Sequence, residues 1–525
     1  MDPCHIRFEL CFILLFGTVV LHSNAVLAQI AGDAYFSAPI VHDISIDLDE
    51  PDWYNVLVQY KWYSDNLDSN VYLPATVTID GTVIDSVGVR FKGNSSYYNY
   101  PTNKKPFKLD FNEFVSGQKF DGLKKMNLNN LYQDPTFMRE KMFLDFVQAH
   151  GLYGPRAAYA RVYINSVYWG LYLSIDQIDK TFVDRVVGNN DGNLFKGDGS
   201  APSCANLEYH GVMSAYYNCY ELKTNETAND WSDLVNLTYQ INQTTNAQFR
   251  DSVEAVLNTP SFLGAWACYT LFANYDSYPF RFSHNYYVYH NSNTDKFDWV
   301  IWDVSTAFGL DIPLSVSQVE NLSAFYIWPD ATDRPLSNRM LQNAIYTQEF
   351  TDLLCQYIPD FNPSVQYPII DSLYSAIQAD VYADGLKMYT DQQFDDNVNS
   401  TVNINGNDVP GLKSFITNRY TNVLAEISQL GCSPLGISEV NVGDDLEVSA
   451  YPNPASQEVI MELKHAATGA SFTLFNIQGQ QVLRSENISG RLFTINTGNL
   501  SNGIYTYQVL LTDGQRISGK LEIEK

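Results

Sequence analysis

The sequence predicts an α+β domain with two lobes, followed by a small all-β sandwich of the immunoglobulin-like type. Strand patterns dominate the first part of the chain, helical patterns take over after Asp230, and short alternating strands begin at Leu446. Strands followed by helices with an embedded hairpin are typical of an α+β arrangement. Short strands at regular spacing, separated by turn residues, are typical of a β-sandwich.

The first lobe is predicted from residues that alternate between apolar and polar. Strands are expected over 44–48, 75–79, 86–91 and 106–111, and a hairpin over 158–164 and 170–175 turns at Asn165-Ser166. A helix is expected over 135–149, because Asp134 offers an N-cap, Pro135 suits the first helical position and Gly151 follows the end.

The later part is predicted to be helical, with one strand pair over 286–290 and 298–302 and a closing helix over 415–430. A boundary near 433–446 precedes tail strands over 459–463, 471–476, 481–485, 506–511 and 519–523. We therefore expect a signal peptide at 1–28, a main domain at 29–440 and a C-terminal module at 441–525.

The N-terminal residues predict export from the cytoplasm. Arg7 precedes an apolar run over 10–21, and small residues that end at Ala28 offer a cleavage site for a signal peptidase. The run is too short for a membrane span, and no later segment reaches about 18 uninterrupted apolar residues. We expect an exported chain that has no membrane span.

The charge of the chain indicates which partners it can bind. The chain has 32 Lys and Arg against 59 Asp and Glu, a formal net charge of −27. Such a surface repels nucleic acid, so no nucleic-acid partner is expected.

Four of the cysteines are candidates for two disulfides. Cys204 and Cys219 flank a loop rich in Tyr and Asn and form the first candidate pair, and Cys355 with Cys432 is the second. This pairing leaves Cys268 as a buried thiol.

Three polar residues around the predicted strand pair form a candidate metal site. Asp276 follows an apolar helix, Asn285 opens the first strand and Asp303 closes the second. A hairpin brings the ends of its two strands together, and carboxylate and amide oxygens are ligands for a hard divalent cation. Phosphoryl transfer needs such a set, with one Asp to orient the attacking hydroxyl and Asn with Asp to hold magnesium.

Basic residues upstream are candidates for binding phosphate. Residues 88–96 join a strand to a polar glycine loop and include Arg90 and Lys92, and a second strand carries Lys108 shortly after Lys105. A lysine in a strand can bury its stem and present its ammonium group to phosphate oxygens. Each piece by itself is more often a turn or a solvated strand residue, and no Walker-type phosphate loop is present.

The chain from about residue 44 to 309 resembles the CotH (spore-coat protein H) kinase-like family, a remote branch of the protein-kinase fold. The matching stretches are 88–96, 105–111, 123–129, 138–141, 163–165, 169–172, 177–179, 193–196 and 302–303. The resemblance implies transfer of phosphate from ATP, with Mg²⁺ or Mn²⁺, to Ser or Thr of an extracellular protein. It implies Asp276 as the catalytic base, Asn285 and Asp303 as metal ligands, and Lys108 or Lys105 as the phosphate-binding lysine.

Two positions depart from the family pattern. Ser305 stands where the family usually has the second Asp of Trp-Asp-x-Asp, and Asp176 stands where it tends to have Glu before Gln-Ile-Asp. Because Asp is one methylene shorter than Glu, an ion pair from Asp176 to the lysine requires a closer approach. Either change is expected to weaken binding of the metal or the nucleotide.

The C-terminal module resembles the type A sorting domain of the type IX secretion system. The matching stretches are 451–454, 475–479, 500–505 and 519–521, in the order that the family has them. The resemblance implies the type IX secretion machinery as a partner. It also implies that the protein passes through the periplasm to the outer-membrane surface or into the medium.

Two other functions compete with a secreted kinase. A non-catalytic surface protein or carbohydrate binder would use its many Tyr and Trp residues for stacking, although such residues are more often part of the core. A glycoside hydrolase would use Asp276 and Asp303 as its two carboxylates, but it would leave the lysine strand and Asn285 without a task. Metal-dependent nucleotide binding separates the kinase from both alternatives.

Overall fold

The chain forms two compact units, Met1–Cys432 and Ser433–Lys525. The structure is a computed structural model that describes residues 30–67, 69–197, 204–310, 313–327, 333–432, 448–476, 481–511 and 516–525. The predicted signal peptide and the predicted boundary near 433–446 lie outside the described residues. The mixture of strands and helices confirms the α+β class.

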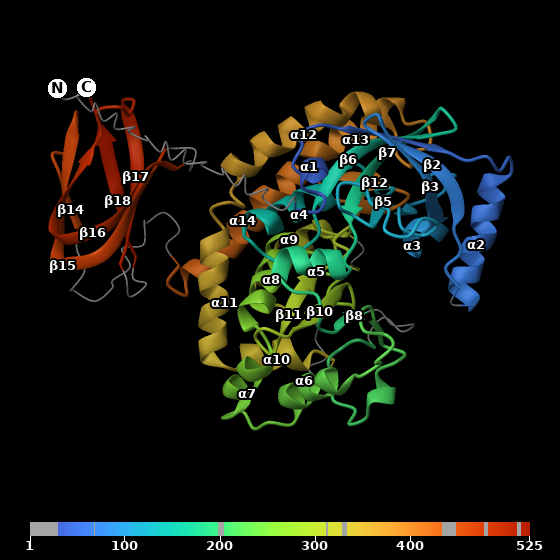
Figure 1. The fold of residues 1–525 in the computed structure, drawn as a ribbon, viewed down its shortest axis with the longest axis horizontal. Coiled ribbons are helices and arrows are strands. Elements are labelled where there is room, and N and C mark those ends of the chain that lie inside the picture. Colours follow the sequence, from blue (N-terminus) through green and yellow to red (C-terminus); the bar gives the residue numbers. More distant parts are fainter. Residues whose placement is uncertain are drawn as a thin grey trace, which may run out of the picture. The chain divides into compact units, whose positions relative to one another are not determined.

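A closed barrel of seven strands, in the order β1-β2-β3-β4-β5-β7-β6, forms the first part of the larger unit (Figure 1). Its strands are β1 (His42–Asp47), β2 (Leu73–Ile79), β3 (Thr82–Phe91), β4 (Phe107–Asp110), β5 (Lys125–Asn129), β6 (Ala157–Ile164) and β7 (Val167–Asp176). Alternate residues such as Val77, Val89 and Leu109 fill its interior. The residues between them therefore face outward. Helices α1 (Asp33–Phe36), α2 (Trp53–Leu67) and α3 (Ser95–Tyr98) complete this part.

Helix α4 (Arg139–Ala149) begins four residues later than the sequence predicts. The carboxylate of Asp134 accepts hydrogen bonds from the backbone N–H groups of Thr136 and Arg139, so it caps a turn before it reaches the helix. Phe137 has a φ of 61°. This left-handed conformation interrupts a right-handed helix and moves its start to Arg139.

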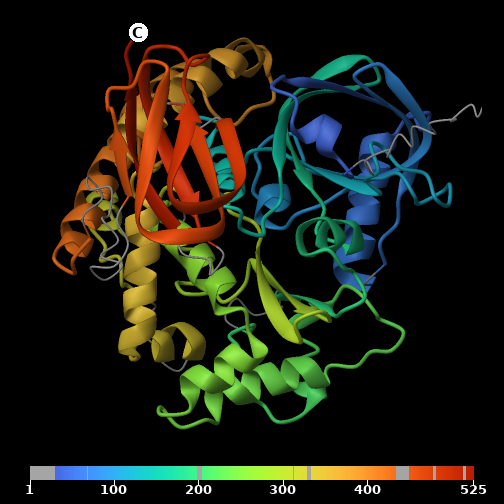
Figure 2. The ribbon, with the colours of Figure 1, turned by 60° about the vertical axis from the view of Figure 1, so that its left-hand side comes forward.

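A second sheet, in the order β11-β10-β8-β9, lies beneath the barrel in both ribbon views (Figures 1 and 2). Its strands are β8 (Leu194–Gly197), β9 (Tyr220–Leu222), β10 (Tyr286–Asn291) and β11 (Lys296–Ile301). The β10–β11 hairpin confirms the predicted strand pair, with Tyr286 opposite Ile301. β8 also pairs with β10, which the sequence does not predict.

Helices make up most of the remaining larger unit. They are α5 (Lys180–Val187), α6 (Ser232–Asn242), α7 (Phe249–Val256), α8 (Thr259–Leu271), α9 (Val316–Glu320), α10 (Pro335–Leu341), α11 (Ala344–Tyr357), α12 (Pro363–Ala383), α13 (Asp391–Asn399) and α14 (Leu412–Ser428). A 3-10 turn (Met213–Ala215) and the short strands β12 (Val402–Ile404) and β13 (Asn407–Val409) lie between them. α8 is buried on nearly all sides, because its residues are apolar around the whole helix. None of the described helices has the length and apolar character needed to cross a membrane.

Both candidate cysteine pairs are joined as disulfides. Cys204 bonds to Cys219, and Cys355 in α11 bonds to Cys432 just after α14. Cys268 is a buried free thiol in α8, as the sequence predicts.

The C-terminal unit consists of antiparallel strands around its own apolar core. They are β14 (Val448–Tyr451), β15 (Glu458–Phe475), β16 (Gln481–Asn496), β17 (Gly503–Leu510) and β18 (Arg516–Ile523). The two strands expected over 459–463 and 471–476 are wrong as separate strands, because β15 runs through both. Register shifts between β15 and β16 fall in the part of β15 that joins the two expected strands.

Candidate functional site

Lys92, Asn129 and Glu140 form a partly buried polar chain at one end of the barrel. Lys92 directly follows β3, and its Nζ donates a hydrogen bond to Asn129 Oδ1 at 2.8 Å. Asn129 Nδ2 in turn donates to both carboxylate oxygens of Glu140, at 3.0 and 3.1 Å. Glu140 is the second residue of α4 and is 4% exposed. The amide of Asn129 therefore bridges the lysine to the acid.

Asp303 lies close enough to this chain to act on both charged groups. Burial raises the pKa of the Glu140 carboxyl, and the charge of Asp303 raises it further. Burial also lowers the pKa of the Lys92 ammonium group, an effect that Asp303 and Glu140 oppose. The Lys92 ammonium also lies 5.6 Å from the centre of the Trp302 ring. One lysine and two acids thus meet where the barrel faces the β10–β11 hairpin.

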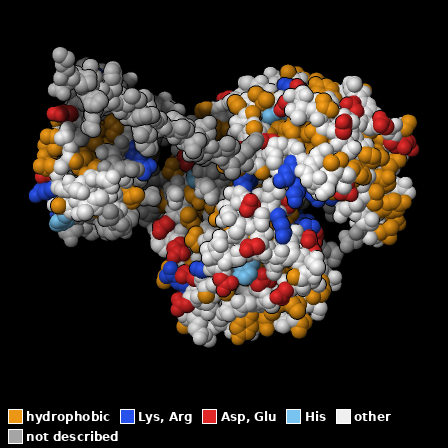
Figure 3. Space-filling model, viewed as in Figure 1, with side chains coloured by type: hydrophobic (Ala, Val, Ile, Leu, Met, Phe, Trp, Pro, Cys, Tyr) orange, Lys and Arg blue, Asp and Glu red, His pale blue; other side chains and the backbone are white. Residues whose placement is uncertain are grey.

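The outward face of the barrel beside this chain is basic. Arg90 in β3 lies opposite Lys108 in β4, and Lys108 lies opposite Asn127 in β5. Burial lowers the pKa of Lys108 well below its usual range, and the surrounding Arg90, Lys125, Lys92 and Lys223 lower it further. Lys and Arg side chains gather between the barrel and the sheet beneath it (Figure 3). A cation cluster of this kind in an acidic chain is stabilised by an anionic ligand.

Asp276 and Asn285 are joined at the start of the β10–β11 hairpin. Asn285 Nδ2 donates to the backbone carbonyl of Asp276 at 2.9 Å. Because this bond uses the amide nitrogen, the Oδ1 atom of Asn285 is left as an acceptor or ligand. The ring Nε2 of His284 lies 2.6 Å from Asp276 Oδ1. Asn285 has a φ of 62°, so the chain turns sharply just before β10.

Asp303 stands two residues past the end of β11, in a loop that is tied to the segment before Asp276. It has a φ of 45°, and its Oδ1 accepts a hydrogen bond from the Ser305 hydroxyl at 2.9 Å. Further along the loop, the backbone N–H of Phe308 donates to Phe272. These bonds fix the loop that carries Asp303 relative to the segment that carries Asp276.

Two predicted site residues have other partners. The Lys105 ammonium donates to the backbone carbonyls of Tyr97 and Tyr100, both at 2.8 Å. Asp176 forms ion pairs with Arg156 at 2.7 Å and with Arg185 at 2.9 Å, and not with a lysine. The acid that approaches Lys92 is Glu140, which reaches it through the amide of Asn129.

Sequence reasoning missed Glu140, Asn129 and His284. Glu140 and Asn129 belong to stretches that resemble the family, but no local pattern identifies the lysine that each one faces. His284 precedes Asn285 directly, and its approach to Asp276 depends on the turn between them. A signal that could have found Glu140 is its position as the only acid in the first turn of α4.

Comparisons with known proteins agree with these features. A profile of the CotH kinase protein family matches residues 89–423. The chain is 26% identical over 328 residues to inner spore coat protein H of Bacillus subtilis, which covers 62% of this chain and 85% of that protein. It is 25% identical over 247 residues to invasin CotH2 of Rhizopus delemar, which covers 44% of this chain and 40% of that protein.

The C-terminal unit has its own match. A profile of the secretion system C-terminal sorting domain covers residues 449–524 and indicates export to the cell surface or into the medium by the type IX machinery. Among solved structures, CopC from Methylosinus trichosporium OB3b aligns with 15% of this protein and 90% of CopC at 20% identity. The TM-score of 0.13 is too low to indicate a shared fold. Because the first profile spans well over half of the sequence, the chain belongs to the CotH kinase protein family.

Proposed function

We propose that this protein is a secreted kinase that transfers the γ-phosphate of ATP to Ser or Thr residues of an extracellular or surface protein. The observation that carries the proposal is the convergence of Lys92, Glu140 and Asp303 beside the hairpin that starts at Asn285. In this proposal the barrel and the helical part are the two lobes of a remote protein-kinase-like fold, and the tail is an immunoglobulin-like sorting module that acts after a signal peptide.

The basic face of the barrel suits the phosphates of the nucleotide. Arg90 and Lys92 are two residues apart, about 6.6 Å along an extended chain, so they can contact different phosphate oxygens of one nucleotide. Lys108 opposes Arg90 and supplies a third cation. Glu140 holds Lys92 in place through Asn129, which leaves the remaining protons of the ammonium group for phosphate.

The residues around the hairpin fit a magnesium or manganese ion held jointly with a nucleotide. The described residues contain no group of three or more His, Cys, Asp and Glu that could hold a metal by themselves. Mg²⁺ commonly binds through one or two protein oxygens together with substrate phosphates and water. Asp303 and Oδ1 of Asn285 would hold it, and the ion would offset the charge of the transferring phosphoryl group.

In this proposal Asp276 acts as the catalytic base. Its backbone carbonyl is fixed by Asn285, and His284 contacts its Oδ1. Its other carboxylate oxygen can accept the proton of an acceptor hydroxyl and orient that hydroxyl toward the phosphorus atom. Ser305, in the place of the usual second Asp, donates to Asp303 and keeps that carboxylate oriented.

Phosphate incorporation from labelled ATP tests the proposal directly. The purified protein is incubated with Mg²⁺ or Mn²⁺ and a Ser-rich acceptor, and compared with the variants Asp276→Asn and Asp303→Asn. We expect incorporation to disappear in both, because each removes a charged oxygen that the reaction needs. Asp295→Asn is the matched control, since Asp295 lies in the turn of the same hairpin and its side chain is 94% exposed.

Nucleotide binding separates the two roles. By calorimetry, Asp276→Asn should still bind ATP in the presence of metal, whereas Asp303→Asn should bind it weakly. If the protein shows neither phosphate incorporation nor metal-dependent nucleotide binding, the proposal is wrong. The protein would then be a non-catalytic surface or carbohydrate-binding protein on the same fold.

A further inference from the structure

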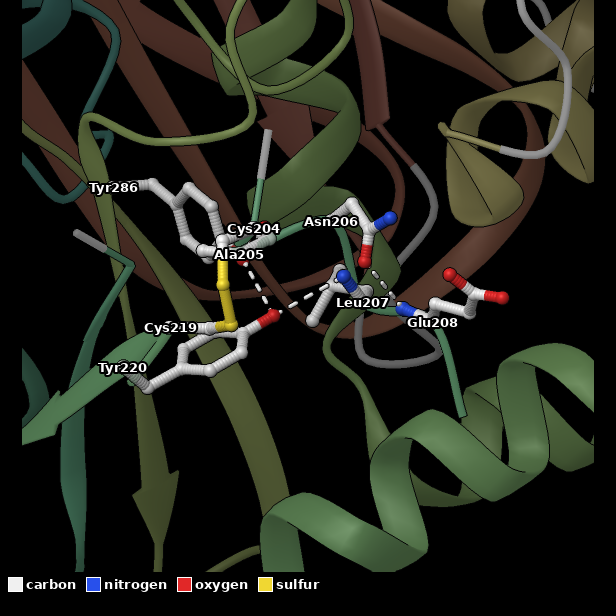
Figure 4. Close-up of a disulfide and its surroundings, with 8 residues drawn as sticks. All are labelled: Cys204, Ala205, Asn206, Leu207, Glu208, Cys219, Tyr220 and Tyr286. Atoms are coloured by element: carbon white, nitrogen blue, oxygen red, sulfur yellow. Dashed lines mark hydrogen bonds between the residues drawn. A yellow bond between two sulfur atoms is a disulfide. The ribbon is translucent and has the colours of Figure 1, made fainter. Parts of the chain in front are cut away.

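The loop closed by the Cys204–Cys219 disulfide is anchored at its base inside the molecule. Ala205 and Leu207 are each 1% exposed, and Cys219 is also buried. Figure 4 shows the disulfide beside Tyr220 and Tyr286, with the backbone of residues 205–207 directed toward the two rings. The loop is therefore part of the core at its base.

Two tyrosines connect this base to the segment of the candidate site. The Tyr286 hydroxyl donates to the Ala205 carbonyl at 2.7 Å, and the Tyr278 hydroxyl donates to the Asn206 carbonyl at 3.1 Å. Tyr220, the residue after Cys219, lies with its hydroxyl 3.2 Å from that of Tyr286 and accepts from the Leu207 N–H at 3.1 Å. The disulfide thus joins the two chain segments that these hydrogen bonds also connect, at residues 204–207 and 219–220.

The same two tyrosines lie next to Asp276 and Asn285 in the chain. Tyr278 follows Asp276 by two residues, and Tyr286 directly follows Asn285. Both rings are fully buried, and Tyr286 stacks on Trp299 with ring centres 4.1 Å apart. Burial raises the pKa of both hydroxyls, so both remain protonated donors. If residues 205 and 206 move away, the buried Tyr278 hydroxyl loses the Asn206 carbonyl, and the Tyr286 hydroxyl keeps only the longer contact with Tyr220. Such losses at buried donors are unfavourable and displace the segment.

We propose that the Cys204–Cys219 disulfide is a positioning device for the site, which assembles the segment 276–285 only when the two cysteines are oxidised. The inference rests on the proposed kinase function. In the reduced chain the loop is held by hydrogen bonds and side-chain packing without a covalent link, and the segment samples positions in which Asp276 and Asn285 are misplaced. The enzyme is then weakly active in a reducing compartment, where ATP is abundant, and fully active after export.

The oxidation needs a disulfide donor, such as a thiol–disulfide oxidoreductase of the exporting compartment or oxidised glutathione. The thiolate of one cysteine attacks the donor disulfide and releases one thiol, and the second thiolate then attacks the mixed disulfide and releases the other. Cys204 and Cys219 lose two electrons and two protons together, and the donor disulfide becomes two thiols. Exported proteins meet such donors, whereas cytosolic proteins are kept reduced.

Hydrogen exchange tests the positioning without relying on activity. The purified protein is compared with the double variant Cys204→Ser/Cys219→Ser, and with Cys355→Ser/Cys432→Ser, which removes the other disulfide. We expect faster amide exchange over 276–286 in the first variant only, with exchange over 88–92 in the barrel unchanged. Unchanged exchange over 276–286 in the first variant would overturn the proposal.

Kinetics supply a second measurement. In the Cys204→Ser/Cys219→Ser variant we expect kcat to fall about 10- to 100-fold, as a small misplacement of reacting groups does, while the KM for ATP stays within about twofold. Wild-type protein treated with reductant should lose activity in parallel and regain it with oxidised glutathione. An equal loss in the Cys355→Ser/Cys432→Ser variant would show general destabilisation and contradict the proposal.

Two outcomes distinguish this inference from the proposed function. A protein that shows no phosphate incorporation in any redox state refutes the kinase, while the exchange measurement still decides the positioning role. Should the double variant not fold, Tyr286→Phe keeps the disulfide and removes the bond to Ala205. This variant should also lower kcat with little change in the KM for ATP, and an unchanged kcat would contradict the proposal.

Discussion

Glu140 is buried and Lys92 is half-buried, and this decides how these two charges respond to pH. Lys92 directly follows Phe91, the buried last residue of β3, and burial lowers the pKa of its ammonium group. Glu140 responds in the opposite direction, because burial and the nearby Asp303 both raise the pKa of its carboxyl. The proposed nucleotide would bring negative charge to this place and stabilise the protonated lysine.

The pH dependence of ATP binding should therefore reveal Lys92. As the pH rises, Lys92 loses its proton well below the ordinary lysine pKa of about 10.4, so the KM for ATP should increase between neutral and alkaline pH. In Lys92→Arg the guanidinium stays charged, and the increase should disappear. Lys105→Arg is the control, since Lys105 binds the carbonyls of Tyr97 and Tyr100. The same increase in wild type and Lys92→Arg would contradict the assignment.

The departure at Ser305 gives a second prediction for a single residue. Ser305→Asp places a carboxylate next to Asp303, where the family usually has one, so the Mg²⁺ concentration for half-maximal phosphate transfer should fall about tenfold. Ser305→Ala removes only the hydrogen bond to Asp303 Oδ1 and should raise that concentration. Titrating activity against Mg²⁺ measures both. Identical titrations for the three proteins would exclude a metal at Asp303.

At the scale of elements, helix α4 is fastened at the end that carries Glu140. Arg139 is 0% exposed; it pairs with Asp134, and its other guanidinium nitrogen donates to Asn397 Oδ1 at 2.9 Å and to the Pro410 carbonyl. The start of α4 is thus connected to α13 and to the loop before α14. This connection holds the end of α4 that carries Glu140.

Removing Arg139 should destabilise the larger unit strongly. Arg139→Met leaves the buried Asp134 carboxylate without its cation, and breaking a buried ion pair from one side costs about 3–5 kcal/mol of unfolding free energy. Lys141→Met is the matched control, because Lys141 forms an i,i+4 pair with the half-exposed Asp145 worth under about 1 kcal/mol. Urea unfolding measures both, and a similar loss in the two variants would contradict the anchoring role.

At the scale of the whole molecule, the sorting domain and the candidate site lie in different units of the chain. The larger unit and the C-terminal unit each bury an apolar core of their own. The disulfide from Cys355 to Cys432 closes the larger unit at its last residue, so a truncation that ends at Cys432 keeps that bond. The barrel and the helical part are joined by the ion pair of Lys104 and Asp384, both 0% exposed.

Removing residues 433–525 should abolish export and leave the chemistry unchanged. In a bacterium with a type IX system, the truncated protein should remain with the cells while the full chain reaches the surface or the medium, as immunoblots of each fraction show. Its kcat and thermal midpoint should match those of the intact protein, because no core residue of the larger unit is lost. Release of the truncated protein would contradict the role of the tail.

The sequence by itself determined the α+β class, six of the seven barrel strands (all but β5), the hairpin that places Asn285 near Asp303, and the two cysteine pairs. These features follow from residues that are close in the chain, or from alternation and turn chemistry that act locally. The start of α4 was predicted four residues too early, because the left-handed Phe137 depends on the packing around it.

Only the tertiary structure decided which basic residue meets which acid. Lys104 forms an ion pair with Asp384, Lys105 donates hydrogen bonds to backbone carbonyls, and Lys108 lies among other cations on the basic face. These three lysines lie within five residues of one another. Lys92 reaches Glu140, 48 residues away in the sequence, through Asn129. Burying a charged side chain is unfavourable unless the fold places a partner beside it. That partner lies far away in the sequence, so the local sequence does not identify it.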